Sequence, residues 1–173
     1  LQEAFQHKIL RHICNTAGIE RYPGAEFDMV RLGIGLYGID PFTNQIIHNV
    51  STLKTTILQI HEVPKEETVG YSRKGHLERA SRIAANPIGY ADGLNRRLGN
   101  GHAYCLVNGQ KAPYVGNICM DVCMIDVTDI DCKEGDKAII FGDDLQVTVL
   151  SEILQTIPYE ILTSVSNSVK LFY

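Results

Sequence analysis

The spacing of apolar residues changes along the chain, and each spacing predicts a different secondary-structure element. Residues 8–16, "KILRHICNT", are short, apolar and end in polar groups, which favours a buried strand whose end reaches a site. Residues 31–38, "RLGIGLYG", predict a second buried strand that contains three glycines. The "GIERYPGAEFDMV" stretch between them reads as a connection with helical parts, and residues 41–49 read as a linker.

The pattern then becomes typical of β-structure. Residues 51–63 are rich in β-branched side chains and predict one long strand. Asn108-Gly109 lies between two apolar runs, which is the strongest short-range signal for a hairpin. Residues 118–130 predict a half-buried strand, and residues 136–142 a short strand that ends in glycine.

Near the C-terminus the apolar spacing is helical. Leu150, Ile153, Leu154 and Ile157 fall at i, i+3, i+4 and i+7, which predicts an amphipathic helix. Pro158 either ends this helix or opens a second short one. The whole pattern therefore predicts the end of an α/β unit, then a mainly β domain, then a helical hairpin.

The composition argues against several classes of function. The 173 residues are 45% hydrophobic and 21% charged, as in an ordinary globular protein, and the net charge of −4 argues against nucleic acid as a partner. No apolar run reaches the roughly 18 residues of a membrane helix. Five cysteines without a secretory signal indicate reduced, buried thiols in the cytoplasm, and the scattered histidines give no metal site. The opening "LQEAFQHKILRHI" reads as mid-domain sequence, so we expect a longer parent chain.

Tyr90 in "IGYADG", residues 88–93, has two interpretations. It is either a half-buried packing tyrosine before an Asp92-Gly93 turn, or an acid–base group. A tyrosine ordinarily titrates near pH 10, so a basic role near neutral pH needs a nearby cation. Arg31, Arg96 and Arg97 are candidates for that cation, and the sequence does not choose among them.

Two other segments contain chemically suggestive residues but prove nothing alone. Gly33, Gly35 and Gly38 have the spacing G-x-G-x-x-G, but they fall in a predicted strand, so the match to a dinucleotide motif is weak. Arg31 is unusual in an apolar strand, because a buried guanidinium needs partners. Met120-Asp121 is equally consistent with an ordinary strand residue and a capping carboxylate.

Taken together, these segments resemble alanine racemase, a pyridoxal-phosphate enzyme. The matching runs are in the family's order and cover nearly the whole chain: "RLGIGLYG", "VGY", "IGYADG", "GQKAPYVGNICMD" and "IPYEILTSVS". The runs "GLNRRLGNG" and "VGNICMDVCMIDVTDI" look most like the racemase part of fused cell-wall ligase–racemase proteins. The resemblance implies that residues 1–42 are the end of a cofactor-binding (β/α)₈ barrel and that residues 43–173 are the C-terminal β domain, ending in short helices.

The resemblance also assigns cofactor contacts. Thr16, the backbone of Gly33 and Ile34, and Asn167 would bind the phosphate of pyridoxal 5'-phosphate. Arg31 would face the pyridine nitrogen. Because an arginine stays protonated, it donates a hydrogen bond there without transferring a proton, which weakens the cofactor as an electron sink.

The same resemblance assigns the substrate contacts. Tyr90 would be the base that acts on L-alanine, reaching the cofactor of a second subunit in a homodimer. Met120 would contact the substrate carboxylate through its backbone N–H, with Asp121 beside it in the access region. The product, D-alanine, would serve peptidoglycan synthesis in the cell wall.

Three departures from the family pattern stand out. No lysine of this chain lies in the family's cofactor-lysine motif, so we expect the 173 residues alone to be inactive. Asn117 and Asn167 stand where many relatives have arginine and tyrosine, so at Asn167 a hydrogen-bond donor is kept while the entrance becomes wider and less apolar. The alternative hypothesis is a non-catalytic binding or interaction module that retains the β-domain fold.

Overall fold

The computed structural model describes residues 2–172, which form two compact units, Leu1–Val50 and Ser51–Tyr173. The first unit contains η1 (Gln2–Ala4), α1 (Thr16–Arg21) and η2 (Ile34–Tyr37). The second contains nine strands and five helices, whose bounds are β1 (Leu53–Thr56), β2 (Gln59–Val63), β3 (Thr68–Val69), η3 (Tyr71–Arg73), β4 (Gly75–His76), β5 (Ser81–Asn86), η4 (Tyr90–Asp92), η5 (Arg96–Leu98), β6 (Tyr104–Val107), β7 (Gln110–Val115), β8 (Cys123–Asp126), β9 (Lys137–Phe141), α2 (Val147–Leu154) and α3 (Pro158–Ser164).

In the first unit, the predicted buried strand over residues 8–16 is an extended segment that pairs with residues 28–31. Residues 8–16 form no regular strand; Arg11 O and Cys14 O accept hydrogen bonds from Asp28 N and Arg31 N at 3.1 and 2.9 Å. The segments therefore run side by side in the same direction. Of residues 8–16, Cys14 alone is buried, so the prediction of a buried strand was wrong for the described part of the chain.

An ion pair ties these two segments together. The Arg11 guanidinium donates to both carboxylate oxygens of Asp28, at 2.9 and 3.3 Å. These hydrogen bonds lower the pKa of Asp28 to about 2. The carboxylate therefore stays charged, and the pair stays intact, at neutral pH.

The predicted strand over residues 31–38 was also wrong. Its second half is the short helix η2, which ends at Gly38 with a left-handed φ of 69°. A Cβ at Gly38 would lie 1.7 Å from the carbonyl oxygen of His48. The segment 41–49, predicted as a linker, instead folds back so that Ile39 and Ile46 form an antiparallel bridge.

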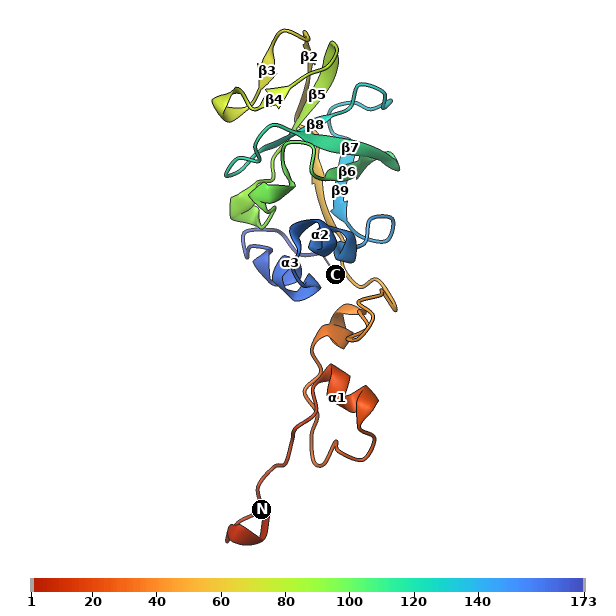
Figure 1. The fold of residues 1–173 in the computed structure, drawn as a ribbon, viewed down its shortest axis with the longest axis vertical. Coiled ribbons are helices and arrows are strands. Elements are labelled where there is room, and N and C mark those ends of the chain that lie inside the picture. Colours follow the sequence, from red (N-terminus) through yellow and green to blue (C-terminus); the bar gives the residue numbers. More distant parts are fainter. Residues whose placement is uncertain (1, 173) are drawn as a thin grey trace. The chain divides into compact units, whose positions relative to one another are not determined.

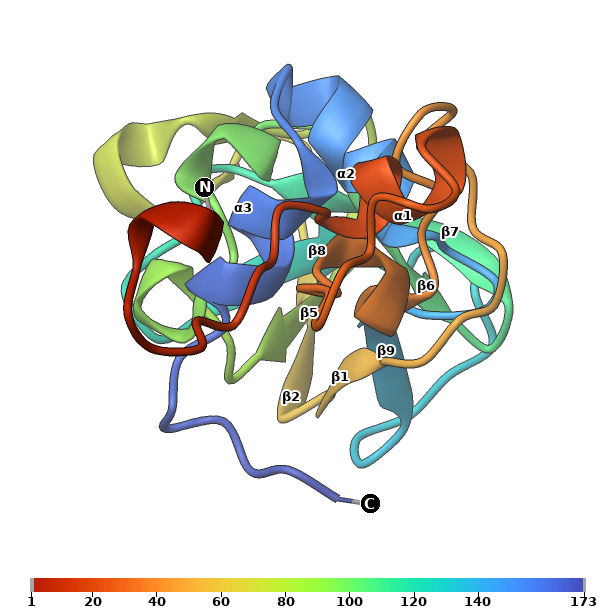
Figure 2. The ribbon, with the colours of Figure 1, turned by 90° about the horizontal axis from the view of Figure 1, so that it is seen from below.

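The second unit is a curled antiparallel sheet with the strand order β1-β9-β6-β7-β8-β5-β2. The two edge strands, β1 and β2, are consecutive in the chain. Ile57 N donates to Asp136 O beside β9, and Leu58 N donates to Ala85 O on β5, so the link between β1 and β2 joins the two edges. The strands accordingly follow one another around a ring (Figure 2).

The single long strand predicted over residues 51–63 is therefore divided into β1 and β2. The division lets one stretch of β-branched residues pair with β9 on one side and β5 on the other. The Asn108-Gly109 hairpin is confirmed: both residues have positive φ, 49° and 75°, as a type I′ turn requires, and Val107 pairs with Gln110.

The C-terminal helical hairpin is confirmed with shorter helices. Gln155 adopts a left-handed φ of 55° and ends α2 before Ile157, which is 57% exposed. Pro158 opens α3, where its missing N–H costs nothing. Both helices lie at the opposite end of this unit from the β3–β4 ribbon (Figure 1). Their buried residues Leu150, Leu154 and Ile161 line the same small apolar cavity as Leu94 and Leu98.

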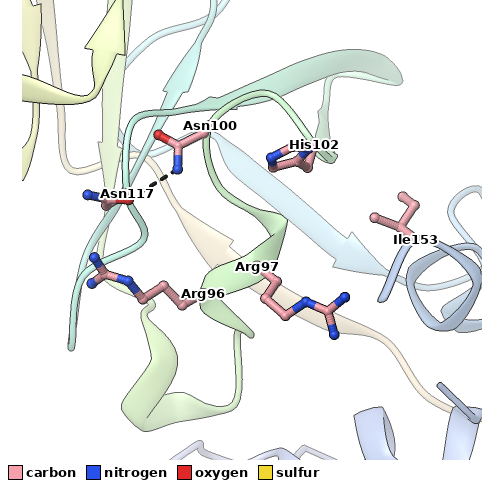
Figure 3. A pocket seen from close by; sticks show the side chains of 6 residues that line it. All are labelled: Arg96, Arg97, Asn100, His102, Asn117 and Ile153. Atoms are coloured by element: carbon pink, nitrogen blue, oxygen red, sulfur yellow. Dashed lines mark hydrogen bonds between the residues drawn. The ribbon is translucent and has the colours of Figure 1, made fainter. Parts of the chain in front are cut away.

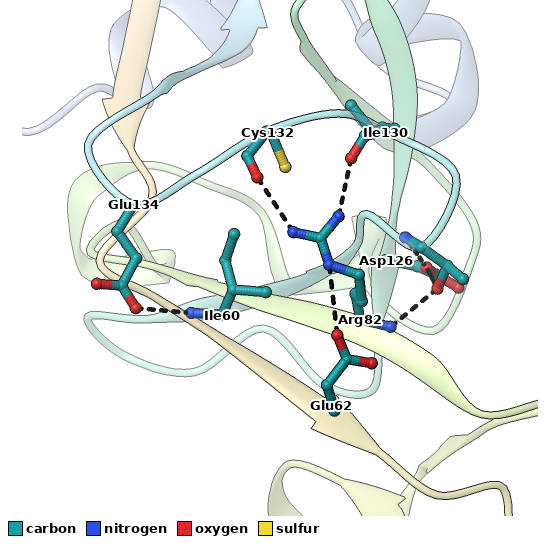
Figure 4. A network of polar contacts seen from close by, with 8 residues as sticks. Ile60, Glu62, Arg82, Asp126, Ile130, Cys132 and Glu134 are labelled. Atoms are coloured by element: carbon teal, nitrogen blue, oxygen red, sulfur yellow. Dashed lines mark hydrogen bonds and ion pairs between the residues drawn. The ribbon is translucent and has the colours of Figure 1, made fainter.

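Arg82 on β5 clamps a long loop against the sheet. Its guanidinium donates to the carbonyl oxygens of Ile130 and Cys132, both at 3.1 Å, and lies 3.6 Å from Glu62 (Figure 4). The Ile130 and Cys132 residues are buried. Loss of the guanidinium would therefore leave two loop carbonyls without their charged donor.

We predict that Arg82→Met lowers the free energy of unfolding by about 2 kcal/mol, because hydrogen bonds to a charged donor are lost while the aliphatic stem is kept. Urea unfolding measures this value. Arg79→Met is the matched control, since Arg79 makes an exposed pair with Asp129, whose loss should change stability little. Equal losses in the two variants would contradict the clamp.

Candidate functional site

Tyr90 lies on a sharp turn at the end of β5. The chain leaves the sheet at Asn86, passes through Gly89 and enters the single turn η4. The Asp92 carboxylate accepts a hydrogen bond from Gly89 N at 2.9 Å, and Gly93 closes the turn with a left-handed φ of 105°. The predicted Asp92-Gly93 turn is thus confirmed, and the Tyr90 side chain is 44% exposed.

A second segment from far along the chain holds this turn in place. Tyr90 N donates to Cys119 O at 2.9 Å, and Ala91 N donates to Met120 O at 3.0 Å. These two bonds bring Tyr90 and Met120 together across 30 residues of sequence. The Met120 side chain is 54% exposed, and Asp121 is also exposed.

The Met120 backbone N–H makes no hydrogen bond within the described chain. Among residues 2–172 no acceptor receives a hydrogen bond from Met120 N, whereas its neighbour Cys119 N donates to Val122 O at 2.9 Å. An exposed phenol and an open N–H therefore occur on two segments that are joined by backbone hydrogen bonds. Neither signal was visible in the sequence, because both depend on a contact between distant segments.

Gly89 permits this close approach. A Cβ there would lie 2.2 Å from Met120 O and 2.4 Å from Cys119 O. The backbone of Gly89 is extended, with φ −146°, a conformation open to any residue. The requirement for glycine is therefore set by contact with the second segment.

The C-terminal segment joins the same cluster. Ser166 N donates to Asp92 O at 3.1 Å, and Ser164 Oγ donates to Gly93 O at 3.2 Å. Asn167 follows at the exposed tip of a turn in which Val169 N donates to Ser166 O. The structure thus brings the segments of Tyr90, Met120 and Asn167 together in the second unit.

The remaining candidates lie in the first unit. Thr16 Oγ1 accepts hydrogen bonds from Gly33 N at 2.9 Å and Gly35 N at 3.3 Å. Arg31, expected to be buried, is exposed and donates to Ile13 O at 3.2 Å. Thr16 and the glycine-rich segment are therefore brought together as a group of a hydroxyl and backbone amides.

The cysteines are structural. All five are free thiols, and four are buried, the exception being the partly exposed Cys119. Burial raises the pKa of Cys105 to about 12 and also raises the pKa of Cys123. Thiols of this kind stay protonated at neutral pH and are poor nucleophiles.

Comparison with known proteins agrees with this architecture. The chain is similar to crystal structures of alanine racemase from Clostridium difficile 630 in complex with cycloserine (36% identity, TM-score 0.83, 91% of this chain and 44% of that chain) and from Bartonella henselae with covalently bound pyridoxal phosphate (36%, 0.83, 92% and 45%). The fold therefore places the chain among the racemases.

Sequence comparison identifies the family. The model for the alanine racemase C-terminal domain matches residues 50–173, and the model for the N-terminal domain matches residues 1–41. Alanine racemase from Clostridium novyi (strain NT) is 42% identical over 94% of this chain, and the enzyme from Helicobacter pylori (strain J99) is 36% identical over all of it. The chain belongs to the alanine racemase family, and it spans about half the length of these curated relatives.

We predict that Gly89→Ala lowers the free energy of unfolding by about 3 kcal/mol, because the new methyl group collides with two backbone carbonyls that cannot move independently. Gly101→Ala is the control. Its Cβ would meet no atom within 4 Å, so it carries only the cost of a left-handed backbone, about 1 kcal/mol. Urea unfolding of both variants measures the difference, and equal costs would show that the 89–120 contact is not tight.

Proposed function

We propose that this chain is part of a pyridoxal-phosphate-dependent alanine racemase that interconverts L- and D-alanine. The observation that carries the proposal is the presentation of Tyr90 against Met120 by two backbone hydrogen bonds. In this proposal the enzyme works in the cytoplasm as a homodimer and supplies D-alanine for peptidoglycan. A fused upstream ligase stays a prediction, which the coding sequence before Leu1 tests.

The first unit fits one part of the cofactor. Phosphate oxygens accept hydrogen bonds from hydroxyl groups, and the N–H groups of Gly33 and Gly35 donate to Thr16 Oγ1, which positions that hydroxyl while leaving its own hydrogen for an acceptor. A Cβ at Gly35 would lie 2.9 Å from the Thr16 methyl group, so a larger residue would crowd this donor group. Thr16, Gly33 and Ile34 would hold the phosphate, with Asn167 as a further candidate.

Arg31 would hold the pyridine ring. One amino group of its guanidinium donates to Ile13 O, which fixes the side chain while other N–H donors remain for the ring nitrogen. When bound, the cofactor withdraws electrons from the α-carbon of the amino acid and makes its proton removable. An arginine partner moderates this withdrawal, since it does not protonate the ring.

In the proposed mechanism Tyr90 moves the proton on one face of the α-carbon. Racemisation requires removal of a proton from one face and its return on the other, so two acid–base groups are needed. Tyr90 would act on L-alanine at the site of the partner subunit, and the cofactor lysine of the family would act on D-alanine. The open N–H of Met120 would orient the substrate carboxylate, with Asp121 beside it.

We predict that Tyr90→Phe in the complete, cofactor-loaded enzyme slows racemisation in both directions by about 10²- to 10⁴-fold, the usual cost of losing a positioned acid–base group. Exchange of the α-hydrogen with solvent deuterium separates the two faces. Exchange from D-alanine should survive in part, whereas exchange from L-alanine should fall much further. Equal losses for the two isomers would show that Tyr90 is a packing residue.

We also predict that the purified 173-residue chain shows no racemase activity and no absorbance of a cofactor bound through lysine. None of its lysines lies in the family's cofactor-lysine motif. Absorbance spectra in the presence of pyridoxal phosphate, together with a D-alanine assay, test this. Saturable racemisation by the purified chain would contradict it.

A further inference from the structure

A basic hollow lies on the second unit beside the Tyr90 turn but is not lined by Tyr90 or Met120. Its volume is about 470 Å³ (Figure 3). No acidic side chain lines it, and every lining residue except the isoleucine carries N–H donors. The lining residues are Arg96, Arg97, Asn100, His102, Asn117 and Ile153.

Hydrogen bonds hold the side of this hollow that Asn100 and Asn117 form. Asn100 Nδ2 donates to Asn117 Oδ1 at 3.1 Å, and Asn117 Nδ2 donates to Tyr71 O at 3.2 Å. The backbone of Asn100 is tied to Gly116 O at 2.7 Å. Because a carboxamide nitrogen carries two hydrogens, Asn100 and Asn117 each keep a second N–H beyond these bonds.

The arginines occupy two sides of the hollow (Figure 3). Arg97 Nη1 donates to Leu154 O at 3.1 Å, at the C-terminal end of α2, which orients its guanidinium and leaves other N–H groups for a ligand. Arg96 is exposed, and its guanidinium makes no hydrogen bond or ion pair within residues 2–172, whereas its backbone carbonyl accepts from Gly99 N. Two arginines that are adjacent in sequence thus line one concave surface from different sides, and no carboxylate lines it, on a chain whose net charge is −4.

We propose that this basic hollow, lined by Arg96, Arg97, Asn100, His102, Asn117 and Ile153, binds the phosphate group of a small molecule. Guanidinium groups match phosphate oxygens in geometry and charge, and the imidazole and carboxamide N–H groups approach from the remaining sides. Ile153 is the one residue of this lining without an N–H donor in its side chain, so a compact anion can receive hydrogen bonds from several sides of the hollow. This site is additional to the phosphate contacts proposed in the first unit.

Isothermal titration of the complete, cofactor-saturated protein tests the proposal, since the cofactor's own phosphate site is then filled. We expect inorganic phosphate to bind saturably at one further site per chain, more weakly as sodium chloride is raised. Succinate, the carboxylate probe, should bind less tightly. Arg96→Gln and His102→Gln should each weaken phosphate binding by about tenfold or more, the effect of losing charged or well-placed donors.

Lys65→Gln is the matched control, because it removes one exposed positive charge outside the hollow. Circular dichroism confirms that each variant is folded. Absence of saturable phosphate binding, tighter binding of succinate, or the same loss in Lys65→Gln would overturn the proposal. Tyr90→Phe should lose racemase activity but still bind phosphate in the hollow, so the two proposals are tested independently.

Discussion

The candidate site depends on one close contact between backbones. Tyr90 N and Ala91 N donate to the carbonyl oxygens of Cys119 and Met120, and Gly89 has no side chain to prevent it. These bonds fix the backbone that carries the phenol, and the N–H of Met120 has no acceptor in the described chain. A tyrosine on a free loop would sample many positions, so its reach to a substrate would carry an entropic cost that this contact removes.

The closed sheet makes that contact possible. Tyr90 follows β5, and Cys119 precedes β8, and these two strands are neighbours with Asn86 opposite Cys123. The register of β5 and β8 therefore determines which residues of the segment after β5 meet the segment before β8. The register is in turn held by the ring, because β5 pairs with β2 and the β1–β2 link joins the two edges of the sheet.

Local signals in the sequence predicted the elements that local physics determines. Asn108-Gly109 specifies its turn through positive φ at both residues, and Pro158 opens α3 for the same kind of reason. The wrong predictions concern distant contacts. Position 38 requires glycine because a side chain there would collide with the carbonyl oxygen of His48. Residues 51–63 are divided because their two halves pair with different strands. Likewise, the residue types Tyr90 and Met120 pointed to a site through resemblance, but their meeting across 30 residues is a property of the sheet.

Two tyrosines of the second unit show what placement contributes to chemistry. Tyr114 is 1% exposed, its hydroxyl has no partner among residues 2–172, and burial raises its pKa well above the usual value. Such a phenol stays protonated, and the side chain contributes to packing of the core. Tyr90 carries the same group on a turn that is fixed by hydrogen bonds yet open to solvent. A proton-transfer group must be both positioned and accessible, and Tyr90 combines a fixed backbone with an exposed side chain. The turn itself, residues 89–93, contains no lysine or arginine. We therefore propose that Tyr90 completes its site against a cofactor held by another subunit.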